Sequence, residues 1–191
     1  MQSVRMKDRC FFGYGSLVNR RTHDYDGRQP ARVTGWRRAW RRSPLRDVCY
    51  LTAVPARDDY IEGLIAAVPD GNWSALDARE RAYARVPLGS EISYAAGDLE
   101  VVLYAIADGD HHAPTDRNPV LLSYIDVVVQ GYLAEFGTDG VTHFFETTEG
   151  WHAPILDDRA APIYPRAQTL STEERAIVDE GLSRLSVRVR R

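Results

Sequence analysis

The chain has 191 residues, of which 44% are hydrophobic and 27% charged, and it carries a formal net charge of −3. These values are typical of an ordinary globular protein of one domain that can bury a core without disulfides. The mild acidity gives no electrostatic reason to expect a nucleic acid or a membrane surface as the main partner.

The sequence also indicates where the protein works. No apolar run approaches the roughly 20 residues of a membrane span, and the start, MQSVRMKDRC, lacks the apolar core of a secretory leader. The two cysteines, Cys10 and Cys49, form no C-x-x-C motif. We therefore expect a cytoplasmic protein without a disulfide.

Patterns typical of β-strands come first along the chain. The run ARVTGWRRAWRR is broken by Gly35 and predicts one or two strands, and VCYLTAV is rich in β-branched and aromatic residues. The predicted strands cover residues 10–14, 31–42, 48–54, 61–69 and 99–107.

A short helix is predicted at the centre of the chain. Ser74 is a candidate N-cap, and Asp77, three residues later, can close a capping box, which predicts a helix from Ala75 to about Arg81. Glu80 falls near its end, and the pattern alone does not distinguish this glutamate from Glu62, Glu91 or Glu146.

Two further helices are predicted in the second half. Pro119 opens a segment with apolar residues at 121, 125, 128, 129, 132 and 133, which fit one helical face ending at Gly137. Residues 171–185 begin with Ser-Thr and carry glutamates in the first turn. The Pro- and Asp-rich segment between these helices has no period. Strands with non-repeating helices predict an α+β domain, with a barrel-like sheet and helices against it.

The glycine turn after the first strand, Gly13-Tyr14-Gly15-Ser16, is the first candidate site. A nucleophile elbow fails because position 18 is Val, and a phosphate loop or dinucleotide fingerprint lacks its lysine or its third glycine. Two interpretations remain open. The segment is either a tight strand-end turn or a cradle of backbone N–H groups for an anion or a carbonyl.

Two other patterns predict little chemistry. Strand alternation in RRAWRR places Trp36 and Trp40 on one face with Arg38 and Arg42, which we interpret as an exposed sheet face and only weakly as an RNA-binding surface. The five histidines have no ligand spacing, so we expect no metal site.

Three motifs occur in the order found in one enzyme family. FFGYGSL is followed by LDARE, and then by PVLLSY with Gly131 seven residues after Tyr124. In this order they resemble the γ-glutamylcyclotransferase family, including its ChaC-type branch, over residues 10 to 137. A weaker similarity surrounds Thr52 and Gly63.

The sequence also departs from the family pattern. Val120 stands where the family has Ser, and RRSPLRDVCY does not reproduce the R-G-x-P-G-R stretch of the ChaC-type branch, so the branch stays open. Residues 138–191 have no counterpart. We expect one domain, 1–191, with 138–191 as an extension packed on it.

The resemblance implies an α+β fold with a small mixed β-barrel and flanking helices. It also implies a cofactor-independent and metal-free enzyme that cleaves a γ-glutamyl amide, closing the glutamyl part to 5-oxoproline. Glu80 would be catalytic. The implied substrate-binding residues are Phe12, Gly13, Tyr14, Gly15, Ser16, Leu17 and Tyr124.

The resemblance leaves the leaving group open: an amino acid, a peptide such as glutathione, or an amine, as in γ-glutamylamine or antibiotic-type enzymes. A non-catalytic binder of γ-glutamyl-like ligands is the alternative from another class. The expected partner is this small molecule, without nucleic acid or membrane, and the expected state is a monomer or homodimer.

Overall fold

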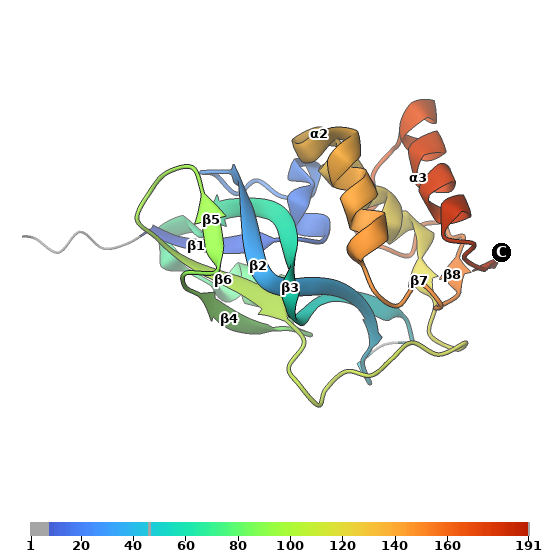
Figure 1. The fold of residues 1–191 in the computed structure, drawn as a ribbon, viewed down its shortest axis with the longest axis horizontal. Helices are drawn as coiled ribbons and strands as arrows, with labels where there is room; N and C mark the ends of the chain where they lie inside the picture. The colour runs from blue at the N-terminus through green and yellow to red at the C-terminus, as the bar shows by residue number, and fades with distance from the viewer. Residues whose placement is uncertain (1–7, 46, 191) are drawn as a thin grey trace, which may run out of the picture.

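The computed structural model describes residues 8–45 and 47–190. Its centre is a curled, mixed six-stranded sheet in the order β4-β6-β1-β3-β2-β5 (Figure 1). Strands β1 and β6 are parallel, and the other neighbours are antiparallel. The strands are β1 (Asp8–Gly13), β2 (Gln29–Arg42), β3 (Cys49–Ala67), β4 (Ala84–Leu88), β5 (Ile92–Tyr94) and β6 (Leu99–Ala105).

The long hairpin of β2 and β3 forms much of this sheet. Prediction of a strand over 31–42 is confirmed, with an irregularity between Thr34 and Trp36, where Gly35 has a φ of 78°. The separate runs predicted at 48–54 and 61–69 are the two halves of β3. They join because β2 pairs with both halves, and so the polar residues between them remain within the strand.

The face of β2 that carries Arg38 and Trp40 is buried, so the prediction of an exposed face is wrong: both residues are 0% exposed. The Arg38 guanidinium donates to the Tyr132 hydroxyl at 3.0 Å and to the Thr147 hydroxyl at 2.9 Å. Packing of helix α2 (Leu122–Thr147) over this face, which strand alternation does not reveal, explains the difference.

The short helix α1 (Ser74–Arg79) exists, but its predicted capping box is wrong. Ser74 is the first helical residue, and its N–H donates to Asn72 Oδ1 at 3.0 Å. Asp77 Oδ1 instead accepts from the Tyr104 hydroxyl at 2.6 Å. Asn72 satisfies a free N–H at the helix start, which leaves Asp77 available for a contact with the sheet.

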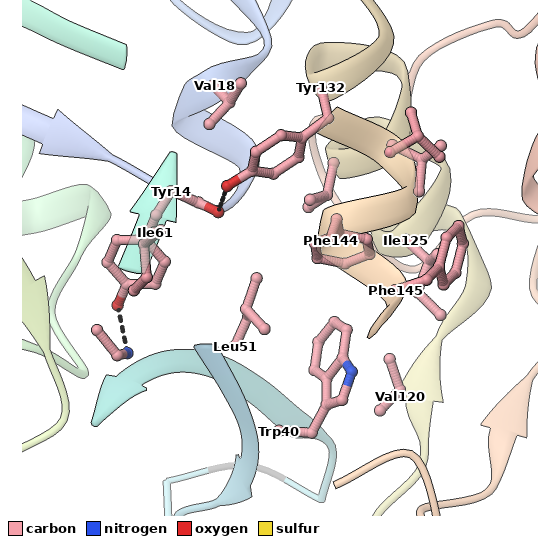
Figure 2. Close-up of a cluster of buried hydrophobic side chains, with 14 of the residues drawn as sticks. Tyr14, Val18, Trp40, Leu51, Ile61, Val120, Ile125, Tyr132, Phe144 and Phe145 are labelled. Carbon is pink, nitrogen blue, oxygen red and sulfur yellow. Dashed lines mark hydrogen bonds between the residues drawn. The ribbon is translucent and has the colours of Figure 1, made fainter. Parts of the chain in front are cut away.

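Helix α2 begins after a two-residue strand, β7 (Val120–Leu121), and extends past its predicted end. Gly137 adopts φ 65° and ψ −161°, so the first helical segment does stop there. A second segment then runs to Thr147, which the sequence analysis did not predict. Side chains from both segments pack against β2 and β3 in Figure 2. They are Ile125, Tyr132, Phe144 and Phe145, which share one buried cluster with Leu51 and Trp40, and Tyr132 points toward Tyr14.

The last helix, α3 (Thr172–Arg184), confirms the third predicted helix, and Ser171 and Glu174 form its capping box. It packs beside α2 on one side of the molecule (Figure 1). A small parallel sheet joins β7, β8 (Ile155–Leu156) and β9 (Val189–Arg190).

The predicted α+β class, with a barrel-like curled sheet and flanking helices, is confirmed. The division into one domain with 138–191 as an extension stays a prediction. Within residues 8–45 and 47–190, no helix is long and apolar enough to cross a membrane.

Candidate active site

Two adjoining hollows lie where the glycine turn after β1 meets the end of α1 and the start of α2, and the larger is named the outer cavity and the smaller the inner recess. The outer cavity has a volume of about 380 Å³. The smaller inner recess is lined by all eight predicted site residues together with Leu51, Tyr83 and Tyr104. The two hollows share Ser16, Leu51, Glu80, Tyr83 and Tyr124.

The glycine turn follows directly from the end of β1. Pairing with β3 stops at Gly13, and Ser16 begins a short 3₁₀ helix, η1 (Ser16–Val18). The N–H groups of Ser16 and Leu17 therefore have no partner within that helix. An added Cβ at Gly15 would lie 2.6 Å from the Tyr124 hydroxyl oxygen, although the φ of Gly15 is −112°. This glycine is required for close approach, and not for a left-handed backbone.

Tyr14 acts mainly as a structural member of the recess. Its hydroxyl donates to the Tyr104 carbonyl oxygen and accepts from the Ala53 N–H at 3.0 Å. Its carbonyl oxygen accepts from the Tyr132 hydroxyl at 2.9 Å (Figure 2). These hydrogen bonds tie Tyr14, and with it the turn, to β6, β3 and α2.

The side chains of Phe12 and Leu17 belong to the packed interior. They are 1% and 6% exposed and lie in two separate hydrophobic clusters. A Cβ at Gly63 would lie 2.5 Å from the Phe12 ring, and one at Gly13 would lie 2.6 Å from Leu17 Cβ. Both residues thus form the wall behind the turn.

Glu80 is the carboxylate of the site. It caps the C-terminus of α1, its side chain is only 14% exposed, and it lines both hollows. Burial raises its pKa above the ordinary value, while the positive charges of Arg79 and Arg166 and a hydrogen bond from Arg79 act in the opposite direction. A carboxyl group with a raised pKa can accept and return protons at a pH nearer neutrality.

Tyrosine hydroxyls surround this carboxylate. Tyr124 comes from the first turn of α2, and burial raises its pKa well above the ordinary value, opposed by a hydrogen bond from the Ser16 backbone. Burial also raises the pKa of Tyr83, whose hydroxyl donates to the Leu51 carbonyl at 3.0 Å. Both phenols therefore keep their protons near neutral pH.

Solved structures share this arrangement of elements. A structure described as a gamma-glutamyl cyclotransferase matches with a TM-score of 0.59 and 13% identity, covering 91% of this chain and 99% of that one. The chain has the γ-glutamylcyclotransferase fold. An uncharacterized protein from Homo sapiens matches with a TM-score of 0.58, 13% identity and the same coverage. YkqA from Bacillus subtilis matches with a TM-score of 0.54 and 16% identity, and the match covers 76% of this chain and 57% of YkqA. No family model and no curated protein matches the sequence.

Within the γ-glutamylcyclotransferase fold of this chain, Arg79 links the turn to the carboxylate. Its side chain is 8% exposed, and its Nε lies 3.1 Å from Glu80 Oε1. Its other nitrogens donate to Ser16 Oγ at 3.2 Å and to the Thr22 carbonyl at 3.0 Å. Sequence reasoning missed this residue, although its position directly before Glu80 in LDARE was a usable signal.

The segment between β8 and α3 also contributes to the outer cavity in this version of the fold. Tyr164, Pro165 and Arg166 line it, and the Tyr164 ring contacts Tyr124 edge-on, with centroids 4.9 Å apart. These residues come from the stretch without a period, and no pattern in the sequence pointed to them.

Both cysteines have buried, free thiols. Burial raises the pKa of Cys10 to about 11 and that of Cys49, which lines the outer cavity, to about 12. Neither is a thiolate nucleophile near neutral pH. In the part of the chain that the structure describes, no group of three or more His, Cys, Asp or Glu residues could hold a metal ion. The arrangement can transfer protons through Glu80 and donate hydrogen bonds from phenols and backbone amides.

Proposed function

We propose that the protein is a γ-glutamylcyclotransferase that converts a γ-glutamyl amide to 5-oxoproline and a free amine. The observation that carries the proposal is the nearly buried carboxylate of Glu80, which lines one recess with the Gly13–Ser16 turn and Tyr124. These groups come from three distant parts of the chain, and the motif order had predicted them as one site.

Glu80 would act as the proton shuttle. The α-amine of the substrate is mostly ammonium near neutral pH, so Glu80 removes a proton before the nitrogen attacks the γ-carbonyl carbon. A new C–N bond closes the five-membered ring. The C–N bond to the leaving nitrogen then breaks as Glu80 returns the proton to that nitrogen, and the second proton lost by the ring nitrogen passes to the released amine, which leaves as an ammonium ion. The raised pKa makes Glu80 a stronger base for the first transfer.

The turn and Tyr124 would hold the reacting carbonyl. The Leu17 backbone N–H and the Tyr124 hydroxyl, which itself accepts from the Ser16 backbone N–H, supply donors for the glutamyl head or for the oxyanion of the tetrahedral intermediate. Holding the glutamyl chain folded makes the attack intramolecular, which supplies several kcal/mol by effective-molarity arguments. Because the substrate provides its own nucleophile, this reaction uses no cofactor.

The proposal includes a small-molecule γ-glutamyl substrate, a cytoplasmic location, and a monomer or homodimer as the working form. A non-catalytic binder is the second candidate, and the Arg79–Glu80 ion pair at 3.1 Å is the observation that favours it. In a binder this pair would only hold the carboxylate in place. Turnover separates the two candidates.

The test is 5-oxoproline release from a panel of γ-glutamyl amino acids, glutathione and γ-glutamylamines, with wild type and Glu80→Gln. We expect release by wild type and a loss on the order of a hundredfold or more in Glu80→Gln, the usual size of an acid–base contribution. Glu146→Gln, on the exposed surface of α2, is the matched control and should keep its activity. Near-normal turnover by Glu80→Gln, with its fold intact by circular dichroism, would contradict the proposal.

A further inference from the structure

The outer cavity and the inner recess differ in charge. Arg79, Arg81 and Arg166 line the outer cavity, whereas no arginine or lysine within residues 8–45 and 47–190 lines the inner recess. Of the residues that the structure describes, Glu80 is the only acidic one in either lining. A substrate that places its glutamyl head in the recess would therefore extend its leaving group toward positive charge.

Among the described arginines of the outer cavity lining, Arg166 is the half-buried one whose guanidinium has no partner. The Arg79 guanidinium is occupied by Glu80, Ser16 and Thr22. Arg81 is exposed to solvent, and Arg166 is half-buried in the cavity wall. Among the described residues, the Arg166 guanidinium makes no hydrogen bond or ion pair, and it acts on Glu80 only through its field. A guanidinium that faces a cavity without a protein partner is available to an anionic ligand, which can form a charge-assisted hydrogen bond with it.

The segment that carries Arg166 is held firmly over the cavity. Buried Asp158 accepts from the Ser123 N–H at 2.8 Å, the Ser123 hydroxyl at 2.6 Å and the Ile163 N–H at 2.9 Å. The Ala167 N–H donates to the Tyr164 carbonyl at 3.1 Å, closing a turn around Arg166. These contacts tie the segment to the start of α2, beside Tyr124.

We propose that Arg166 binds a carboxylate on the leaving group, so that the preferred substrates are γ-glutamyl amino acids or peptides and not γ-glutamylamines. The inference rests on the function proposed above. An amino-acid leaving group carries an anion, and a charge-assisted hydrogen bond to guanidinium is among the strong ones. A neutral or cationic amine would leave Arg166 unpaired or repel it.

Two other roles for Arg166 predict a different result. If its charge only lowered the pKa of Glu80, or if it bound the carboxylate of the glutamyl head, its loss would affect every γ-glutamyl substrate equally. If Arg166 binds the leaving-group carboxylate, its loss changes the ratio of kcat/KM between a substrate with that carboxylate and one without it. The ratio of kcat/KM for two matched substrates is therefore the decisive measurement.

The experiment compares γ-glutamyl-alanine with γ-glutamyl-ethylamine, which lacks only the leaving-group carboxylate. We expect wild type to prefer γ-glutamyl-alanine at least tenfold, and Arg166→Gln to reduce this ratio by about 10- to 100-fold, the range for a hydrogen bond to a charged group. Arg166→Lys keeps the charge and should retain part of the preference. Arg117→Gln, an exposed arginine outside the cavity lining, should leave the ratio unchanged.

The outcomes separate this inference from the proposed function. Release of 5-oxoproline from both compounds, at a ratio that Arg166→Gln leaves unchanged, overturns the role of Arg166 and keeps the cyclotransferase activity. A wild-type preference for γ-glutamyl-ethylamine does the same. No 5-oxoproline from any γ-glutamyl compound overturns both.

Discussion

Gly15 leaves room for the Tyr124 hydroxyl because it has no side chain. An added Cβ there would lie 2.6 Å from the Tyr124 hydroxyl, closer than real Cβ contacts. We expect Gly15→Ala to displace the Tyr124 hydroxyl and to lower turnover about a hundredfold, since a misplacement of about 1 Å can have that effect. The rate of 5-oxoproline release measures this loss, and thermal melting confirms that the variant folds.

Ser16→Ala is the contrasting substitution in the same turn. It keeps the backbone N–H and removes only the hydroxyl that accepts from Arg79 at 3.2 Å, so the loss should be about 1 kcal/mol in activation free energy. The reverse order of damage, or an acyl group trapped on Ser16 by mass spectrometry, would replace cyclisation with a serine-nucleophile mechanism.

At the scale of elements, the segment between β8 and α3 acts as a wall that Asp158 holds in place. Asp158 is 6% exposed, and three donors converge on its carboxylate. Asp158→Ala leaves these donors unsatisfied and should lower the free energy of unfolding by roughly 1–3 kcal/mol. Because Arg166 lies on this segment, the preference for γ-glutamyl-alanine should fall as well.

The neighbouring residue provides the control for that prediction. Asp157 accepts one long bond, from the Arg159 N–H at 3.3 Å, and Asp157→Ala should change urea-unfolding stability and substrate preference little. Equal effects of the two substitutions on the preference would mean that Asp158 does not hold the wall.

The elements differ in how well the sequence predicted them. β1, β6 and α3 were predicted because their patterns are local: an apolar run, or a Ser171 cap with Glu174. The burial of Arg38 was not predicted, because it depends on α2 packing from about a hundred residues further along the chain. Local periodicity carries no information about which face a distant helix covers.

The site shows the same difference between residues that a local motif indicates and residues that only tertiary contacts bring in. Motif order indicated Glu80, the Gly13–Ser16 turn and Tyr124, and the fold brings them into one recess. Arg79 adds hydrogen bonds to two segments, and Arg166 reaches the cavity from an aperiodic stretch. Their roles depend on tertiary contacts, which a single sequence does not encode in a readable pattern.

At the scale of the whole molecule, the site lowers the folding stability of the protein at neutral pH. The fold buries the Glu80 carboxylate, and burial raises its pKa despite the opposing charge of Arg79. A group whose pKa is higher in the folded chain than in the unfolded chain contributes stability that is full below the unfolded pKa and is lost as pH rises through the folded pKa. At neutral pH the folded protein therefore carries the penalty of an ionised, buried carboxylate.

Glu80→Gln tests this penalty in the whole molecule. Gln has nearly the same shape and no charge to desolvate, so the variant should gain stability relative to wild type as pH rises from about 4, below the ordinary glutamate value of 4.5, to 7. Urea unfolding at both pH values measures the two free energies, and Glu146→Gln on the exposed surface should show no such widening. If the gap between Glu80→Gln and wild type stays constant or narrows toward pH 7, then burial does not raise the pKa of Glu80. In that case the carboxylate is held by its ion pair with Arg79, as the non-catalytic alternative requires.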